Sequence, residues 1–176
     1  MRHIIIFFIA LVPLFAASQS TAPHFEKKAI GKSGAYAYLP GQVEDVDLSY
    51  SPDSSKVYTL GSTIKDYRFD VIFVALSAPA QSDEDVSPLL EAYLDYLKGA
   101  LEVTSSAGYG KGRTLSTHPA AKGIIDYWKD KDKNEMTVTG WADKKSIAVL
   151  VITGPEQYPQ VSVADVFFKG FRFPGD

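Results

Sequence analysis

The stretch from Gly108 to Lys122 holds the side chains of this sequence that could bind an anion. Three glycines alternate with Tyr109 and two cations, and its basic residues are Lys111, Arg113, His118 and Lys122. A phosphate-binding loop also needs a helix after its glycines and a Lys-Ser or Lys-Thr pair, and the stretch has neither. We therefore expect a mobile loop between strands, because glycines most often mark turns and loops. The alternative is an anion-binding loop that uses the four basic residues.

His118 is the other candidate for chemistry. It is the only histidine beyond the N-terminal tail, because His24 lies close to the N-terminal segment. A catalytic histidine needs a nucleophile and an orienting carboxylate within reach. The chain has no cysteine, and none of its serines lies in a nucleophile-elbow motif. With Pro119 beside it, His118 is typical of a solvated turn residue. The alternative is a hydrolase or transferase in which His118 works with Asp126. No second His or Cys stands at ligand spacing, so we expect no metal and no cofactor.

Four aromatic residues accompany these candidates: Tyr109, Tyr127, Trp128 and Trp141. The two tryptophans are expected in the core, because aromatic side chains dominate burial. If one of them faces water beside the glycine-rich stretch, a binding patch results. The candidate binding residues are Tyr109, Lys111, Arg113, His118 and Trp128.

The run from Ser146 to Gly154 must be positioned at the centre of any such fold. Its odd-numbered and even-numbered residues are both apolar, and half of the run is β-branched. A strand with two apolar faces must be covered on both sides. The run therefore predicts a central strand.

Other sequence patterns predict the strands that neighbour this central strand and the helices that pack over its two faces. Strands are predicted over 36–39, 46–50, 56–60, 67–76, 124–129 and 136–141, with Gly61 and Ser62 as a break and the strand over 46–50 half-buried. One helix is predicted after Ser82, where apolar residues recur from Val86 to Leu101 at helical spacing. A second, short helix is predicted after Ser162. The sequence predicts an α+β fold, a three-layer α/β/α sandwich whose central antiparallel sheet carries one helix on each face.

The N-terminal segment has the form of a secretory signal. A short basic start precedes an apolar run from Ile4 to Ala17, followed by small residues at the cleavage position. This run is shorter than the roughly 20 residues that span a bilayer. We expect a signal peptide over 1–18, an N-terminal tail over 19–32 and one domain over 33–176, in an exported, periplasmic or secreted protein without a membrane span after cleavage.

Composition limits the partners. The formal net charge is −3 and no basic stripe is present, so we expect no nucleic-acid binding. The chain has no cysteine and therefore no disulfide. Its hydrophobic content of 45% is typical of a globular domain.

Over residues 33–173 the chain resembles the PsbP-like family, which includes many small exported bacterial proteins. The resemblance lies in the order of elements, in the stretch from Tyr67 to Val71 before the long helix, and in Phe167, Phe168 and Phe171. It implies a non-enzymatic binding or accessory role in the cell envelope, with an envelope protein or a small ligand as partner. Beside the enzyme that uses His118, a carrier of a small apolar ligand remains an alternative.

Overall fold

The computed structural model describes residues 23–155 and 161–176. The expected signal peptide over 1–18 lies outside the described residues. None of the helices in the described ranges is long and apolar enough to cross a membrane.

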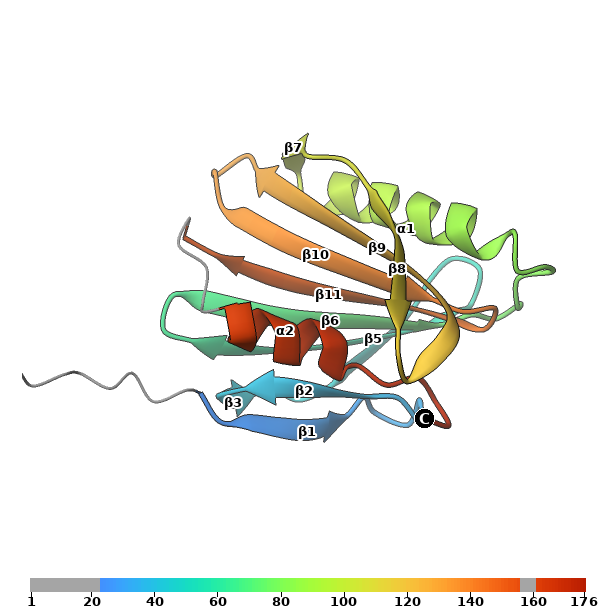
Figure 1. The fold of residues 1–176 in the computed structure, drawn as a ribbon, viewed down its shortest axis with the longest axis horizontal. Helices are drawn as coiled ribbons and strands as arrows, with labels where there is room; N and C mark the ends of the chain where they lie inside the picture. Colours follow the sequence, from blue (N-terminus) through green and yellow to red (C-terminus); the bar gives the residue numbers. More distant parts are fainter. Residues whose placement is uncertain (1–22, 156–160) are drawn as a thin grey trace, which may run out of the picture.

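Nine antiparallel strands form the main sheet (Figure 1). Its central order is β3-β5-β6-β11-β10-β9-β7, with β4 also paired to β5 and β8 to β9. The strands are β3 (Gln42–Val43), β4 (Asp47–Tyr50), β5 (Lys56–Ile64), β6 (Tyr67–Ala75), β7 (Val103–Ser106), β8 (Gly110–Leu115), β9 (His118–Asp130), β10 (Glu135–Ala142) and β11 (Ser146–Gly154). The α+β class and the central place of β11 are confirmed.

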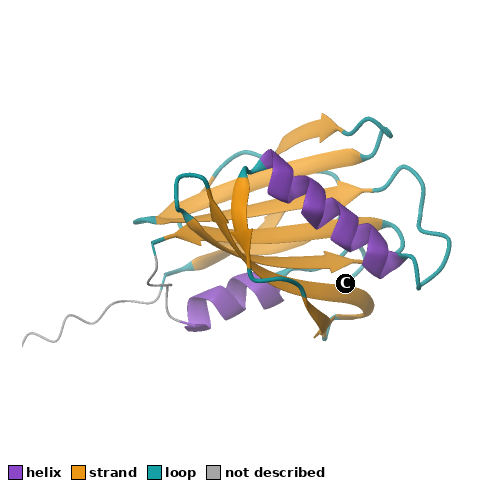
Figure 2. Ribbon diagram, turned by 90° about the horizontal axis from the view of Figure 1, so that it is seen from above, coloured by secondary structure: helices purple, strands orange, loops and turns teal. Residues whose placement is uncertain are grey.

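Strand β11 divides its side chains between two hydrophobic clusters. The odd-numbered residues of 147–151 belong to the cluster that includes α1 (Val86–Ala100). The even-numbered residues of 148–152 belong to the cluster that includes α2 (Val161–Gly170). Figure 2 shows the two helices apart, with strands of the sheet between them. Each cluster defines one face of the sheet, called here the α1 face and the α2 face.

Helix α1 forms where the apolar spacing predicts it. Val86, Leu90, Leu94 and Leu97 are its buried residues, and they lie along one side of a helix. Asp85 precedes the helix without a side-chain cap hydrogen bond to it, and its carboxylate accepts hydrogen bonds from the backbone N–H and the hydroxyl of Ser82, at 2.9 and 2.8 Å. Pro88 then lies in the first turn, where its missing N–H leaves no unmade bond.

The α2 face carries more than the one expected helix. A separate two-stranded sheet of β1 (Phe25–Ala29) and β2 (Tyr36–Pro40) packs there, and Ala37 and Leu39 of β2 are fully buried in the α2 cluster. The expected tail over 19–32 is therefore wrong for β1. The physical reason is that the turn after Ile30 lets β1 pair along its whole length with β2.

Two further strand predictions need correction. Gly61 and Ser62 lie inside β5, where Gly61 makes room for an ion pair: a Cβ there would lie 2.6 Å from the Arg68 guanidinium. Strand β4 forms, but it is not half-buried. Leu48 and Tyr50 are 44% and 63% exposed, because β4 lies at the outside of the sheet with nothing packed over it among the described residues.

Candidate functional site

The glycine-rich stretch is a hairpin of β8 and β9, so the prediction of a mobile loop is wrong. Figure 1 shows β8 crossing in front of the sheet, on the side that carries α2. The glycines permit close packing here. A Cβ on Gly110 would lie 2.8 Å from a methyl group of Ile125, and one on Gly123 would lie 2.2 Å from the ring of Trp141. Glycine therefore allows strands to approach, where the sequence suggested a flexible connection.

A bulge at Gly112 sends the two cations of β8 to opposite faces. Lys111 pairs with Ile124, and Arg113 pairs with Gly123, so the register shifts between them. Gly112 has a φ of 81°, which favours glycine. Since residues opposite each other in a ladder share a face, Lys111 belongs to the α1 face and Arg113 to the α2 face.

The four basic residues do not converge on one anion site. Lys111, Arg113 and Lys122 line a small hollow of about 210 Å³, but there Glu91 already pairs with Lys111 at 2.7 Å. His118 is held elsewhere, by the C-terminal residues. The anion-binding loop in its four-residue form is therefore not assembled.

His118 is not a solvated turn residue. It begins β9, its Nδ1 lies 2.8 Å from Asp176 Oδ1, and its ring lies 4.5 Å from that of Phe173. Its Nε2 lies 3.5 Å from Asp143 Oδ2, and no serine hydroxyl contacts it in the described part of the chain. Asp126 lies farther along the same strand, roughly 25 Å away at about 3.3 Å per residue. His118 and Asp126 therefore do not form the catalytic pair of the alternative prediction, and His118 ties the C-terminal residues to β9.

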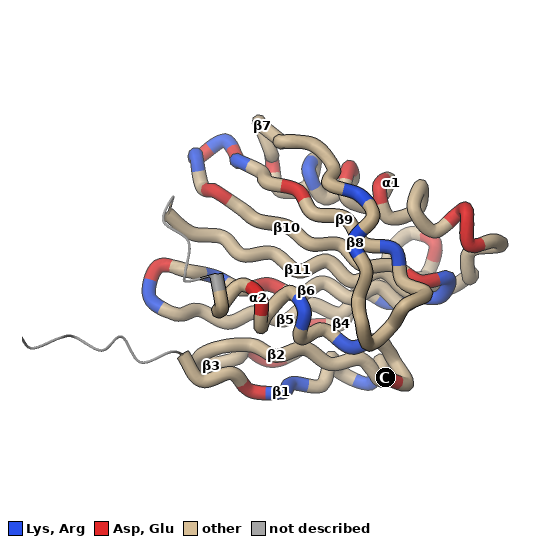
Figure 3. Tube along the Cα trace, viewed as in Figure 1, with Lys and Arg blue, Asp and Glu red and all other residues tan. Residues whose placement is uncertain are grey.

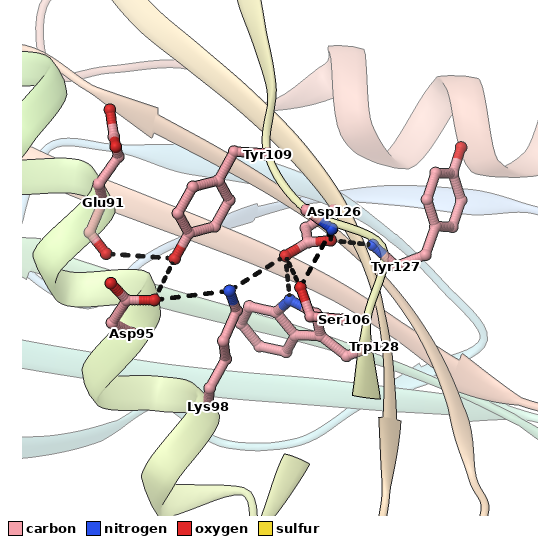
Figure 4. Close-up of polar contacts among 9 residues, drawn as sticks. Glu91, Asp95, Lys98, Ser106, Tyr109, Asp126, Tyr127 and Trp128 are labelled. Atoms are coloured by element: carbon pink, nitrogen blue, oxygen red, sulfur yellow. Dashed lines mark hydrogen bonds and ion pairs between the residues drawn. The ribbon is translucent and has the colours of Figure 1, made fainter. Parts of the chain in front are cut away.

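Asp126 is a buried carboxylate with a full set of donors (Figure 4). They are Ser106 Oγ at 2.7 Å, Trp128 Nε1 at 2.6 Å, the N–H of Gly108 at 3.0 Å and the N–H of Tyr127 at 2.8 Å. Lys98 Nζ lies 3.3 Å away. Burial by itself would raise the pKa of Asp126, but these hydrogen bonds outweigh it and lower the pKa below its ordinary value.

Tyr109 and Lys111 extend this network to α1. The Tyr109 hydroxyl donates to Asp95 Oδ1 at 2.5 Å, and Lys98 Nζ lies 4.1 Å from the centre of the Tyr109 ring. Burial, together with the Asp95 carboxylate, raises the pKa of Tyr109, which stays a neutral donor. We call this network the α1 clamp; it comprises Glu91, Asp95, Lys98, Ser106, Tyr109, Lys111, Asp126 and Trp128.

The α1 clamp accounts for three of the candidate binding residues. Tyr109 and Lys111 hold the hairpin to α1, and Trp128 is 2% exposed with its indole N–H bonded inside the protein. Because these groups are already paired, they support the structure and present little to a ligand. Both tryptophans are buried, as predicted.

A hollow of about 690 Å³ lies between β8 and α2 on the α2 face. This β8–α2 groove has a floor from β9 and β10, with Ile125, Tyr127, Thr137, Thr139 and Trp141. One wall is the stretch from Gly112 to Ser116, and the other is made by Ala164, Asp165, Phe168 and Lys169. The indole N–H of Trp141 donates to the Phe168 carbonyl at 3.3 Å, which joins floor and wall. Binding pockets for small molecules commonly measure roughly 300–1,000 Å³.

Several polar groups of the β8–α2 groove have no partner. Thr137 and Thr139 are 6% and 2% exposed, and neither hydroxyl makes a hydrogen bond within the described ranges. Arg113 is exposed and makes no ion pair with any described residue. Lys169 on the opposite wall pairs with Asp165 at 2.8 Å. Figure 3 shows basic positions on β8 and on α2.

Sequence reasoning singled out Arg113, Tyr127 and Trp141 of the groove lining but missed the others, among them Thr137, Thr139, Phe168 and Lys169. Thr137 and Thr139 alternate with Val138 and Gly140 on a predicted strand, and this alternation was the available signal. Nothing in the sequence placed Phe168 and Lys169 across from β8, because that depends on how α2 packs.

The groove and the α1 clamp contain no assembled metal centre. Within residues 23–155 and 161–176, no group of three or more His, Cys, Asp or Glu side chains is arranged so that it could hold a metal ion. No protein-family model matches this chain, and no curated protein matches its sequence. The site must therefore be interpreted from its own geometry.

Proposed function

We propose that this protein is an exported, non-enzymatic binding module of the cell envelope and that the β8–α2 groove is its binding site. The observation that carries the proposal is a groove of about 690 Å³ whose hydroxyls and guanidinium have no partner among the described residues. Buried polar groups in proteins are normally hydrogen-bonded, so open ones lining a hollow favour a bound ligand. The separation of His118 from Asp126 favours binding over hydrolysis or transfer.

The architecture we propose is a three-layer sandwich of the PsbP-like kind. The two hydrophobic clusters on β11 and the helix in each of them support it. The β1–β2 hairpin then shares the second outer layer with α2. Export rests on the basic, apolar and small-residue pattern at the N-terminus. N-terminal sequencing of the exported protein should give a chain that begins near Gln19, and an intact Met1 would contradict export by cleavage.

The groove suits a small molecule or a short protein segment better than a wholly apolar ligand. Its floor exposes hydroxyl groups beside Ile125, and its walls carry Arg113 and Lys169. An apolar ligand would leave these polar groups without partners, which costs binding energy.

Filling the groove tests the proposal. In Ala164→Trp a large ring enters the groove from α2, whereas in Val166→Trp the same ring lies on the exposed side of that helix. The wild type and both variants would be produced in the native host and isolated from its envelope fraction. Native mass spectrometry would detect retained small molecules, and crosslinking would detect envelope proteins.

We expect the wild type and Val166→Trp to retain the same bound species, and Ala164→Trp to lose it. Circular dichroism and the urea midpoint would show that Ala164→Trp is folded. Equal retention by all three proteins, or no bound species in any of them, would reject the groove as the binding site.

A further inference from the structure

The charge of the β8–α2 groove differs in sign from that of the whole chain. Its lining has two cations, Arg113 and Lys169, and one carboxylate, Asp165, so one positive charge is in excess. The chain has a formal net charge of −3. Because Lys169 is already paired with Asp165, the unpaired positive charge belongs to Arg113.

Arg113 is placed to meet a ligand and not the protein. The bulge at Gly112 turns it to the α2 face, and its Cβ lies over Gly123, where a side chain would come within 2.9 Å of it. Lys111, two positions earlier, turns to the α1 face and pairs with Glu91. A guanidinium presents paired N–H donors that match the two oxygens of a carboxylate.

The floor of the groove adds two hydroxyl groups that, like the Arg113 guanidinium, have no partner among the described residues. Thr137 and Thr139 line the groove and are 6% and 2% exposed, and their hydroxyl oxygens, which have no hydrogen-bond partner among the described residues, keep access to solvent there. Register places them opposite Tyr127 and Ile125, between the two walls. Thr114 and Ser116 add two more hydroxyls on the β8 wall, and Leu115, Trp141 and Phe168 supply an apolar and aromatic surface. The groove therefore combines a cation that has no ion pair with a described residue, hydroxyls on its floor that have no described partner, and an apolar surface.

We propose that the β8–α2 groove binds an organic acid, with Arg113 pairing with its carboxylate and Thr137 and Thr139 bonding to polar groups on its body. The proposal rests on the proposed function, because it names the ligand class of the same site. The carboxylate can belong to a free small acid or to the C-terminus of a peptide, since both present the same group. The remainder of the ligand packs on the apolar lining.

Paired probes that differ only at the carboxylate test this assignment. One pair is indole-3-acetic acid and its amide; the other is an N-acetylated tripeptide ending in phenylalanine, as the free acid and as the amide. Isothermal titration calorimetry on the folded protein would measure all four. The variant is Arg113→Gln, and the matched control is Lys111→Gln, which removes a cation of the same strand from the other face.

We expect at least one acid to bind the wild type about tenfold more tightly than its amide, since a charge-assisted pair is worth roughly that factor. Arg113→Gln should abolish this preference, and Lys111→Gln should keep it. Binding of the small acid alone assigns a free organic acid, and binding of the tripeptide acid alone assigns a peptide C-terminus.

Three results would overturn the proposal: no binding of either acid, equal binding of acid and amide by the wild type, or an equal loss in Lys111→Gln. These failures are distinguishable from failure of the proposed function. If Ala164→Trp still loses the native ligand while acids show no preference, the groove binds a different class of molecule.

Discussion

On the α1 face of the sheet, the Asp126 carboxylate accepts four hydrogen bonds and lies 3.3 Å from Lys98. On the α2 face, the hydroxyls of Thr137 and Thr139 have no partner among the described residues. All three residues are buried and lie on adjacent strands, but the two threonine hydroxyls open into the groove whereas the Asp126 carboxylate is enclosed. Buried polar groups that are paired stabilise a fold, whereas unpaired ones that line a hollow are available to a ligand.

The difference follows from how each face is covered. Helix α1 and the connection through Tyr109 supply donors and cations directly above Asp126. Helix α2 covers the α2 face next to the β1–β2 hairpin, and the floor between α2 and β8 stays open. The contacts on the α1 face thus hold the β8–β9 hairpin in place. On the α2 face, β8 of the same hairpin forms a wall of the groove.

The largest expected effect comes from placing a charge on each face of β11. Val149 and Leu150 are both fully buried, on the α1 and α2 faces respectively. Val149→Asp and Leu150→Asp should each cost several kcal/mol, about the whole stability of a small domain, because the carboxylate has no partner. Urea midpoints measure this. Thr137→Asp on the groove floor should lower the free energy of unfolding clearly less, since water reaches the new carboxylate there. A near-native midpoint for Leu150→Asp would show that the α2 face is open along β11 too.

Removing the central acceptor of the α1 clamp is expected to have the next largest effect. Asp126→Ala leaves the Trp128 indole and the Ser106 hydroxyl without an acceptor, and it leaves Lys98 without its partner. We expect a loss of about 2–4 kcal/mol, as for other broken buried pairs. Chemical unfolding followed by tryptophan fluorescence would measure it. A loss below about 0.5 kcal/mol, the size of an ordinary surface substitution, would mean that Asp126 does not hold the hairpin.

The same carboxylate should make stability depend on pH. Its pKa in the folded protein is lower than in the unfolded chain, where it is about 3.9, so the folded state binds fewer protons in that range. The stabilisation is therefore complete above that pH and is lost as the pH falls through the lower, folded pKa. Urea midpoints of wild type and Asp126→Asn should converge as the pH falls below about 3.9. A gap that is constant over this range would contradict the prediction.

The smallest effect provides the most direct comparison of the two faces. Thr139→Val removes a hydroxyl that has no described partner, so in ligand-free protein it should change stability by less than about 0.5 kcal/mol. Ser106→Ala removes one hydroxyl that donates to Asp126 and should cost about 1–2 kcal/mol. Thermal unfolding of both variants checks this. If Thr139→Val proves as costly as Ser106→Ala, the groove floor is part of the structural network and not a free site.

The sequence by itself determined the strands and helices of the core. Apolar residues on both faces of 146–154 required cover on two sides, and the spacing from Val86 to Leu97 specified α1, because these signals depend only on local periodicity. Burial of Trp128 also followed from residue type. The alternation of Thr137 and Thr139 was visible, but a strand pattern does not show whether a hydroxyl will find a partner.

Only the tertiary structure decided which polar residues are paired and which are free. Lys111 and Arg113 look equivalent in the sequence, yet the bulge at Gly112 sends one to Glu91 and the other to the groove. His118 found the carboxylate of Asp176 and not Asp126, because strand β9 keeps the latter far away. These outcomes depend on contacts between residues distant in the chain, and local sequence patterns carry no information about such contacts.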